Sequence, residues 1–253
     1  MHTTGTMVTL VAGTLLAFHG ALTVGAAEGV AGPAPQPAGA APAAPASGIP
    51  TAERILFLGN SITLHGPSTK VSWTGNWGMA ASAAEKDYVH LVTQALTDKA
   101  GKAPAVMVEN IATFERQFGT YDAATALRKH LDFKPDVLIL AIGENVPALT
   151  TDEAKAQFRT ALTALLNAFK AGSQPRLYVR SCFWPDAAKD GILKDVCAEV
   201  GGTYVDIGAL SKDQKNYARS ERSFAHAGVA NHPGDQGMQA IADALVKAIG
   251  AAK

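Results

Sequence analysis

Short apolar runs alternate along the chain with longer segments in which apolar residues recur every three to four positions. The short runs predict five strands, at residues 54–58, 105–109, 136–142, 176–180 and 203–207. The longer segments predict helices at residues 88–100, 151–171, 187–200 and 235–249. Strands that alternate with helices are typical of an α/β fold, a parallel sheet covered by helices on both faces.

Polar and aromatic side chains gather in the segments that follow the predicted strands. In open α/β sheets, ligands bind beyond the carboxyl ends of the strands, so we expect the functional site at this edge. The residues of these segments that stand out are Ser61, His65, Trp73, Trp77, Glu115, Arg116, Glu144, Asn145, Trp184, His226 and His232.

The first fifty residues differ from the rest of the chain. Residues 7–27 form an uncharged apolar run that ends in small residues, as a secretory signal peptide does, although no Lys or Arg precedes it. The run is also long enough to span a bilayer, so an uncleaved anchor is an alternative, and a misassigned start of translation is another. Residues 28–50 are rich in Pro and Ala and predict an extended linker. We therefore predict a signal peptide or anchor over residues 1–27, one folded domain over residues 51–253, and a secreted or periplasmic protein.

The charge balance excludes one class of partner. The chain has 22 Lys and Arg against 22 Asp and Glu, and Glu28 is the only charged residue among the first fifty. The predicted domain is therefore close to neutral, whereas a protein that neutralises nucleic-acid phosphates needs a basic stripe. We exclude a dedicated DNA or RNA binder.

The cysteines and histidines predict neither a metal site nor a cofactor. Cys182 is expected at the end of a strand and Cys197 on the following helix, on the order of 10 Å apart along its axis. A disulfide needs Cα atoms within roughly 7 Å, so we favour two free thiols over a bridge. The sequence has no H-x-x-x-H, H-E-x-x-H or C-x-x-C spacing and no glycine-rich nucleotide motif.

The strongest local motif is LGNSIT at residues 58–63, where an apolar strand runs into a glycine turn and then a serine. Ser61 can lie at the start of a helix, where free N–H groups favour a developing anion. The alternative for a lone serine is an ordinary helix cap. The motif also differs from the G-x-S-x-G elbow, because position 63 is Thr.

Other strand ends supply possible partners for this serine. Asn145 follows the third predicted strand and could donate to an oxyanion, and His232 precedes the last predicted helix and could act as a general base. A hydroxyl, a base and amide donors are the groups that acyl transfer requires. Taken singly, such an Asn is more often a turn former and such a His a loop residue.

With these motifs, the sequence resembles the SGNH (GDSL-like) hydrolase family. GNSIT at residues 59–63 is similar to the first block of the family, usually Gly-Asp-Ser; GEN at residues 143–145 is similar to its Gly-x-Asn block, and HP at residues 232–233 to its final His block. The resemblance implies a three-layer flavodoxin-like fold with a five-stranded parallel sheet of order 2-1-3-4-5. It also implies an ester hydrolase with Ser61 as nucleophile, His232 as base, and the Ser61 N–H and the Asn145 side chain as oxyanion donors.

One departure from the family pattern lies in the second block. The family usually has Asn-x-x-x-x-Gly after the second strand, and here Glu115 stands at the glycine position after Asn110. The backbone N–H of Glu115 could still donate to the oxyanion. A carboxylate beside that anion would oppose it, so we expect the Glu115 side chain to turn away, towards Arg116 or Arg180.

A second departure concerns the group that orients the base. The family usually has Asp-x-x-His in its final block, and here Val229 stands three residues before His232. Loss of this carboxylate costs about 10⁴ in rate where it has been measured, so an active enzyme needs another acceptor for the Nδ1 proton. The candidates are the main-chain carbonyl of Val229, which would make a Ser-His dyad, and the carboxylates of Glu144 and Asp235. Asp235 is alternatively a cap of the last helix.

An insert after the first block carries two tryptophans, in WTGNWGMA at residues 73–80. The chain is similar in this respect to a subset of exported bacterial SGNH proteins. Trp73 and Trp77, with Trp184, predict a platform for a sugar ring with free indole N–H groups, the alternative being that they cover the core. His65, expected one helical turn after Ser61, could contact substrate, the alternative being that it caps a carbonyl.

The sequence therefore predicts a secreted serine esterase that hydrolyses small acyl esters, O-acetyl groups on a carbohydrate above all, through an acyl-enzyme on Ser61. The alternatives are a glycan-binding domain without activity, which Val229 and Glu115 motivate, and an O-acyltransferase that uses the same serine. We expect a monomer without a cofactor, and no membrane insertion unless the N-terminal segment is uncleaved.

Overall fold

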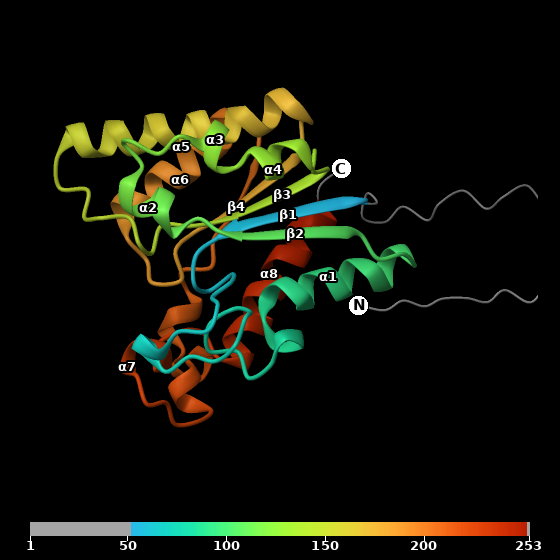
Figure 1. Ribbon diagram of the computed structural model, residues 1–253, viewed down its shortest axis with the longest axis vertical. Coiled ribbons are helices and arrows are strands. Elements are labelled where there is room, and N and C mark those ends of the chain that lie inside the picture. Colours follow the sequence, from blue (N-terminus) through green and yellow to red (C-terminus); the bar gives the residue numbers. More distant parts are fainter. Residues whose placement is uncertain (1–51, 252–253) are drawn as a thin grey trace, which may run out of the picture. The chain divides into compact units, whose positions relative to one another are not determined.

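The computed structural model describes residues 52–251, which form a five-stranded parallel sheet between two layers of helices (Figure 1). The strands are β1 (Arg54–Gly59), β2 (Ala105–Asn110), β3 (Val137–Ala141), β4 (Arg176–Arg180) and β5 (Thr203–Val205). Their order in the sheet is β2-β1-β3-β4-β5, and every neighbouring pair is parallel. The predicted α/β fold and its strand order are confirmed. The predicted signal peptide and linker lie outside the described residues.

Alternate residues of the central strands contribute to two separate hydrophobic cores, one on each face of the sheet. Leu56 and Leu138 point to one face, where they pack against α5 (Asp152–Gly172) and α6 (Ala187–Glu199). Ile55 and Ile139 point to the other face, covered by α1 (Tyr88–Ala100) and α8 (Asp235–Ala251). Because side chains alternate across a strand and both faces are covered, the strand sequences are apolar throughout.

The predicted helices begin and end close to the expected residues because local signals mark their ends. The Asp87 side chain accepts from the His90 N–H at the start of α1, and Thr151 accepts from the Ala154 N–H at the start of α5. α1 ends at Gly101, which has φ of 69°, a conformation that glycine adopts without steric cost.

Several short helices occupy segments for which the sequence predicted no helix. The α-helices among them are α2 (Ala112–Gln117), α3 (Ala123–Ala126), α4 (Arg128–Asp132) and α7 (Ala227–Ala230). The 3-10 helices are Thr69–Val71, Ala84–Lys86, Leu210–Lys212, Gln214–Asn216 and Ala218–Ser220. One or two turns are too short to show a helical period in the sequence.

The helix expected directly after Ser61 is absent, which corrects that prediction. The N–H groups of Thr63 and Leu64 both bond the Asn60 carbonyl, and the chain then extends so that His65 pairs with Trp77 in an isolated bridge. Pro67, which lacks a backbone N–H, follows two residues later and disfavours continuation of a helix. Ser61 therefore lies in a single turn.

Cys182 and Cys197 are both buried and free, as predicted. Burial raises the pKa of both thiols, that of Cys197 to about 11. Both side chains are therefore neutral thiols at neutral pH, without the thiolate that a cysteine nucleophile requires. Among the described residues, no helix combines the length and the apolar character needed to cross a membrane.

Candidate active site

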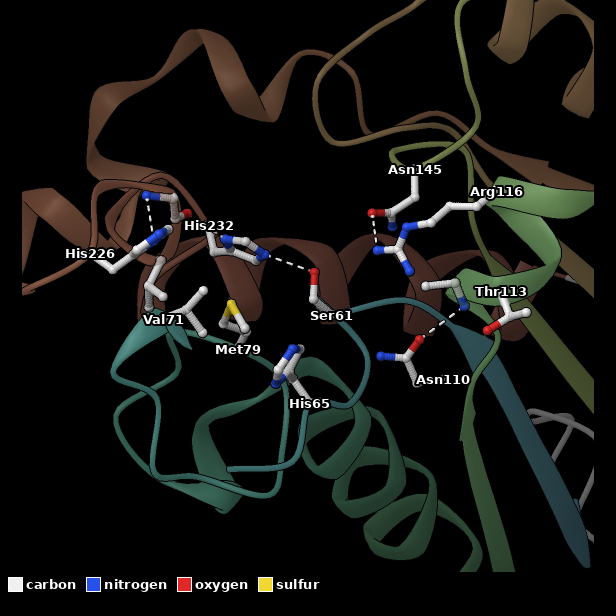
Figure 2. A pocket seen from close by; sticks show the side chains of 13 residues that line it. Ser61, His65, Val71, Met79, Asn110, Thr113, Arg116, Asn145, His226 and His232 are labelled. Carbon is white, nitrogen blue, oxygen red and sulfur yellow. Dashed lines mark hydrogen bonds between the residues drawn. The ribbon is translucent and has the colours of Figure 1, made fainter. Parts of the chain in front are cut away.

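Ser61 and His232 meet at the carboxyl edge of the sheet, although 171 positions separate them in the sequence. Ser61 follows β1, and His232 lies just before α8. The distance from Ser61 Oγ to His232 Nε2 is 2.8 Å (Figure 2). This is hydrogen-bonding distance for a hydroxyl and a base.

A main-chain carbonyl orients the imidazole of His232. His232 Nδ1 lies 2.8 Å from the carbonyl oxygen of Gly228. A carbonyl only accepts, so Nδ1 carries the proton and the lone pair of Nε2 faces Ser61 Oγ. Gly228 belongs to the four-residue helix α7. This helix is too short for its carbonyls to accept from N–H groups of the same helix, so the Gly228 carbonyl is available to His232.

None of the three groups expected to orient His232 does so. The Val229 carbonyl accepts the backbone N–H of His232 at 3.0 Å and is one residue away from the carbonyl that meets Nδ1. Asp235, the first residue of α8, accepts from the N–H and the hydroxyl of Ser82 at 2.7 and 2.5 Å. A main-chain carbonyl does accept from Nδ1, but it is that of Gly228 and not that of Val229.

Glu144 is held by other partners, which corrects our preferred side-chain candidate. Its Oε1 accepts from Arg180 Nη1 at 2.6 Å and from the Phe183 N–H at 2.8 Å. Burial raises the pKa of Glu144, but the charge of Arg180 and the hydrogen bonds from Arg180, Phe183 and Asn60 together outweigh burial and hold the pKa below its ordinary value. Because Arg180 is fully buried, Glu144 serves as its counter-ion.

The environment of His232 favours the neutral imidazole. Burial lowers its pKa below the ordinary 6.5, and this outweighs the hydrogen bond to Gly228 and the charge of Glu144, which act in the opposite direction. A neutral imidazole is the form that can accept a proton from Ser61.

Glu115 is fully buried, and its carboxylate holds the segment after β3. Oε1 accepts from the N–H groups of Gly143 at 2.7 Å and Asn145 at 3.1 Å, and Oε2 accepts from Asn145 Nδ2 at 2.8 Å. Our expectation that this side chain turns towards Arg116 or Arg180 was wrong, because these N–H donors lie within its reach from α2. The backbone N–H of Glu115 donates to the Ile111 carbonyl at 3.3 Å and is not directed at the pocket, which corrects its expected role as an oxyanion donor.

Two partners determine the orientation of the Asn145 amide. Nδ2 donates one hydrogen to Glu115, and Oδ1 accepts from Arg116 Nη2 at 3.0 Å. A flipped amide would set donor against donor and acceptor against acceptor, so this orientation is the favoured one. Asn145 lines the same pocket as Ser61, and the second hydrogen of Nδ2 stays available there.

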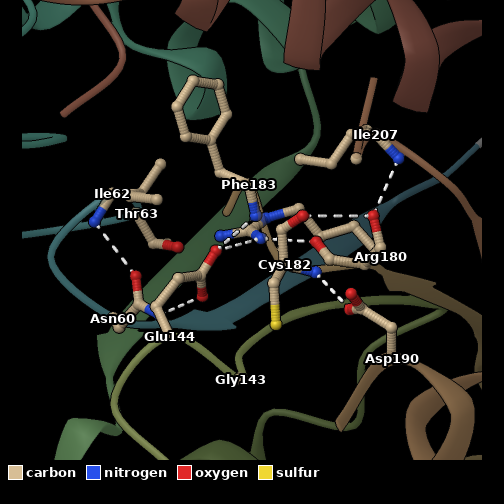
Figure 3. Close-up of polar contacts among 12 residues, drawn as sticks. Asn60, Ile62, Thr63, Gly143, Glu144, Arg180, Cys182, Phe183, Asp190 and Ile207 are labelled. Carbon is tan, nitrogen blue, oxygen red and sulfur yellow. Dashed lines mark hydrogen bonds and ion pairs between the residues drawn. The ribbon is translucent and has the colours of Figure 1, made fainter. Parts of the chain in front are cut away.

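A buried polar layer lies beneath Ser61, and sequence reasoning missed it. Asn60 Nδ2 donates to Glu144 at 2.6 Å and to Glu115 at 3.2 Å, and Asn60 Oδ1 accepts from the Ile62 N–H at 3.1 Å. Figure 3 shows Glu144 between Asn60 and Arg180. An aspartate at position 60 would add a third carboxylate, so the amide suits this site where the family usually has Asp. The available signal was an arginine at the end of an otherwise apolar strand.

The two tryptophans of the insert do not form the expected sugar platform. Trp73 is 8% exposed and donates its indole N–H to the His65 carbonyl at 2.9 Å, and Trp77 donates to the Ala81 carbonyl at 3.0 Å. The two rings pack edge to face, with centroids 5.6 Å apart. Both N–H groups therefore donate to main-chain carbonyls of the protein, and the alternative, that these residues cover the core, is correct for them.

Trp184 and His65 lie at the site in ways that differ from expectation. The Trp184 ring packs edge-on against the imidazole of His232, with centroids 5.6 Å apart, so it helps to hold this imidazole in place. His65 lines the pocket, and its Nδ1 donates to the Gly66 carbonyl at 2.7 Å, which agrees with the alternative that it caps a carbonyl. It reaches this place through an extended segment and not through a helix.

The pocket over Ser61 has a volume of about 450 Å³. Besides the residues already described, it includes polar side chains that the sequence had not assigned to substrate binding. These are Asn110, Thr113, Arg116 and His226.

Comparison with known proteins identifies the fold. No protein-family model matches the sequence, and no curated protein matches it significantly. Among solved structures, the chain is similar to the lipase/acylhydrolase from Enterococcus faecalis, with a TM-score of 0.50 and 17% identity over 77% of this chain and 94% of that one. It is also similar to a protein described as a GDSL-like lipase from Bacteroides uniformis, with a TM-score of 0.50 and 13% identity over the same shares of the two chains. The chain has the SGNH (GDSL-like) hydrolase fold.

The strand register of this SGNH fold explains why the site residues meet. Gly59 of β1 pairs with Asn110 of β2 on one side and with Ala141 of β3 on the other, so the three strands end level with one another. The residues that follow these ends, Ser61 and Asn145 among them, therefore enter one pocket.

Proposed function

We propose that the protein is a serine esterase that hydrolyses small acyl esters, with O-acetyl groups on a carbohydrate as the favoured substrates. The observation that carries the proposal is the 2.8 Å contact between Ser61 Oγ and His232 Nε2, with the Nδ1 proton held by the Gly228 carbonyl. This is the geometry of a Ser-His dyad whose imidazole has the correct tautomer.

In the proposed mechanism, His232 takes the hydroxyl proton while Ser61 Oγ attacks the ester carbonyl. The Ser61 N–H and the free hydrogen of Asn145 Nδ2 stabilise the oxyanion of the tetrahedral intermediate. His232 then protonates the departing alcohol, which leaves an acyl-enzyme. A water molecule, deprotonated by His232, attacks the acyl group and releases the carboxylic acid and free Ser61.

The pocket supports a small acyl group and a hydroxylated alcohol. Its volume of about 450 Å³ is modest, and side chains such as Asn110 and Thr113 can bond sugar hydroxyls. The expected export of the protein agrees with an extracellular carbohydrate as substrate. Because the indole N–H groups of Trp73 and Trp77 already donate to main-chain carbonyls, we expect the sugar to contact the polar lining and not these rings.

Covalent labelling tests the proposal against a glycan-binding domain without activity. A fluorophosphonate reacts with an activated serine, so we expect one adduct, located on Ser61 by peptide mass spectrometry. Saccharide binding without labelling would favour the inactive alternative. An acyltransferase would also be labelled and is separated by its product, an acylated sugar in place of free acid when an acceptor is supplied.

The pH dependence of the reaction is expected to follow the titration of His232. Since burial lowers its pKa, the neutral, active form persists into mildly acidic solution. We expect kcat/KM for p-nitrophenyl acetate to rise with pH along an acid limb whose midpoint lies below 6.5, the ordinary value for histidine. A midpoint at or above 6.5 would contradict the proposed environment of the base.

Glu115→Gln is expected to lower kcat by about 10- to 100-fold with a much smaller change in KM. The glutamine NH₂ would face Asn145 Nδ2, donor against donor, so the oxyanion donor would lose its orientation. Steady-state kinetics well below the unfolding temperature of both proteins measure the effect. The control is Glu199→Gln, in an exposed pair with Arg159, which should change neither constant. Equal kcat values for Glu115→Gln and the parent protein would refute the positioning role.

A further inference from the structure

The pocket over Ser61 is lined by cationic and neutral side chains, with no acidic residue among them. Its lining includes Arg116 and three histidines, His65, His226 and His232. The His226 Nδ1 accepts from the Gly228 N–H at 3.1 Å, so in its neutral form this imidazole carries a hydrogen on Nε2. His65 and His232 use their N–H groups on the carbonyls of Gly66 and Gly228, so the donors that the wall offers to an anion are the Arg116 guanidinium and the Nε2 hydrogen of His226.

Arg116 is exposed, and its charge is not neutralised locally. Within the described part of the chain, its guanidinium bonds the neutral Oδ1 of Asn145 at 3.0 Å and forms no ion pair with a carboxylate. A guanidinium has five N–H donors, so a single bond to Asn145 leaves a face free for a second partner.

The buried carboxylates of Glu115 and Glu144 have partners other than Arg116 and do not offset its charge at the surface of the pocket. Glu115 precedes Arg116 in α2, but successive residues of a helix point about 100° apart, and its carboxylate is turned inwards onto Gly143 and Asn145. Glu144 is paired with Arg180 in the buried layer. The field in the pocket therefore favours a negatively charged group.

The position of Arg116 relates this charge to the reaction. Figure 2 shows Arg116 and Asn145 on one wall, His226 and His232 on the opposite wall, and Ser61 between them. An ester whose carbonyl carbon lies at Ser61 has its leaving oxygen near His232, and other parts of the same molecule can reach Arg116. A carboxylate matches a guanidinium in bidentate geometry.

We propose that the substrate is an ester that carries a carboxylate, and that Arg116 is the residue that binds this group. The inference rests on the proposed esterase function and narrows its substrate class. The carboxylate can belong to the alcohol, as in an acylated uronic acid, or to the acyl group, as in a monoester of a dicarboxylic acid.

Two matched pairs of esters test the proposal. On the alcohol side, 4-acetoxybenzoate is compared with its methyl ester; on the acyl side, mono-4-nitrophenyl glutarate is compared with 4-nitrophenyl methyl glutarate. For each pair, the ratio of kcat/KM for the charged ester to that for the neutral ester is measured in the parent protein and in Arg116→Gln. We expect Arg116→Gln to lower this ratio about five- to tenfold for one pair, and the parent ratio to fall as salt is added.

The ratio separates anion binding from the contact of Arg116 with Asn145, because loss of that contact slows both members of a pair equally. Arg159→Gln, on the exposed face of α5, is the control and should leave both ratios unchanged. Ratios that are the same in the parent and in Arg116→Gln for both pairs would overturn the proposal.

Binding distinguishes failure of this inference from failure of the proposed function. Calorimetry with Ser61→Ala measures the affinity for 4-acetoxybenzoate and for mono-4-nitrophenyl glutarate without turnover, and the added change Arg116→Gln should weaken one of them about five- to tenfold. If the parent protein hydrolyses none of the four esters but this difference in affinity is present, the anion site stands and the esterase is refuted. If hydrolysis is observed and the affinities do not differ, the esterase stands and the anion site is refuted.

Discussion

Ser61→Ala is expected to reduce the release of p-nitrophenol from p-nitrophenyl acetate by at least about 10³-fold, without a lower unfolding temperature. The Ser61 hydroxyl is the proposed nucleophile, and its hydrogen bond in the structure is the 2.8 Å contact with His232. Its removal eliminates the acyl-enzyme but leaves the buried layer of Asn60, Glu144 and Arg180 intact. Initial rates and thermal unfolding of the purified variant provide both measurements.

Ser211→Ala is the matched control for this experiment. Its hydroxyl bonds the Gly208 carbonyl at 3.3 Å outside the pocket, so its loss should leave the rate unchanged. His232→Ala should lower the rate to a similar degree as Ser61→Ala, because nucleophile and base act as one unit. Turnover retained in Ser61→Ala would remove Ser61 from its proposed role, whatever the result for His232→Ala.

Arg180→Met is expected to cause the largest loss of stability among the substitutions proposed for this protein. Arg180 is fully buried, the Glu144 side chain is 5% exposed, and their 2.6 Å ion pair lies under the candidate active site. Breaking such a pair leaves an uncompensated buried charge and costs about 3–5 kcal/mol in the free energy of unfolding. For a domain of this size, that corresponds to a fall of roughly 6–20 °C in Tm, measurable by calorimetry.

Two further variants show whether the charge itself is the cause. Arg159→Met breaks an exposed pair with Glu199 and should cost no more than about 1 kcal/mol. Adding Glu144→Gln to Arg180→Met removes the stranded charge and should restore part of the lost stability. The loss in Arg180→Met should also lessen at lower pH, where Glu144 can be protonated. A Tm for Arg180→Met equal to that for Arg159→Met would refute the stabilising role of the buried pair.

The central strands and the long helices follow from local patterns in the sequence. The run at residues 54–58 is apolar at four consecutive positions, because β1 is an inner strand, between β2 and β3, with both faces covered. α1 begins after Asp87 and ends at Gly101, and both ends have their cause within a few residues. The ends of β3 and β5 differ from prediction by one or two residues, because the pattern of apolar residues marks burial and not the last hydrogen bond of the sheet.

The orientation of individual side chains could not be predicted in this way. Glu115 accepts from Gly143, 28 positions away, and Asn60 donates to Glu144, 84 positions away. Trp73 and Trp77 are residue types that can form a sugar platform, but their indole N–H groups donate to the main-chain carbonyls of His65 and Ala81. Such contacts depend on which donors and acceptors the packing of the whole domain brings within about 3 Å.

The sequence by itself determined the fold class, the strand order that the family resemblance implied, and the positions of Ser61, Asn145 and His232 at strand or helix ends. These features follow from local periodicity and from the order of short motifs. Both can be recognised in one sequence before its packing is known. Only the tertiary structure decided that the Gly228 carbonyl orients His232 and that Glu115 lies beneath Asn145. Every residue has a backbone carbonyl, so no residue type in the sequence marks the one that accepts from His232. A buried carboxylate is stable only where packing supplies its N–H donors.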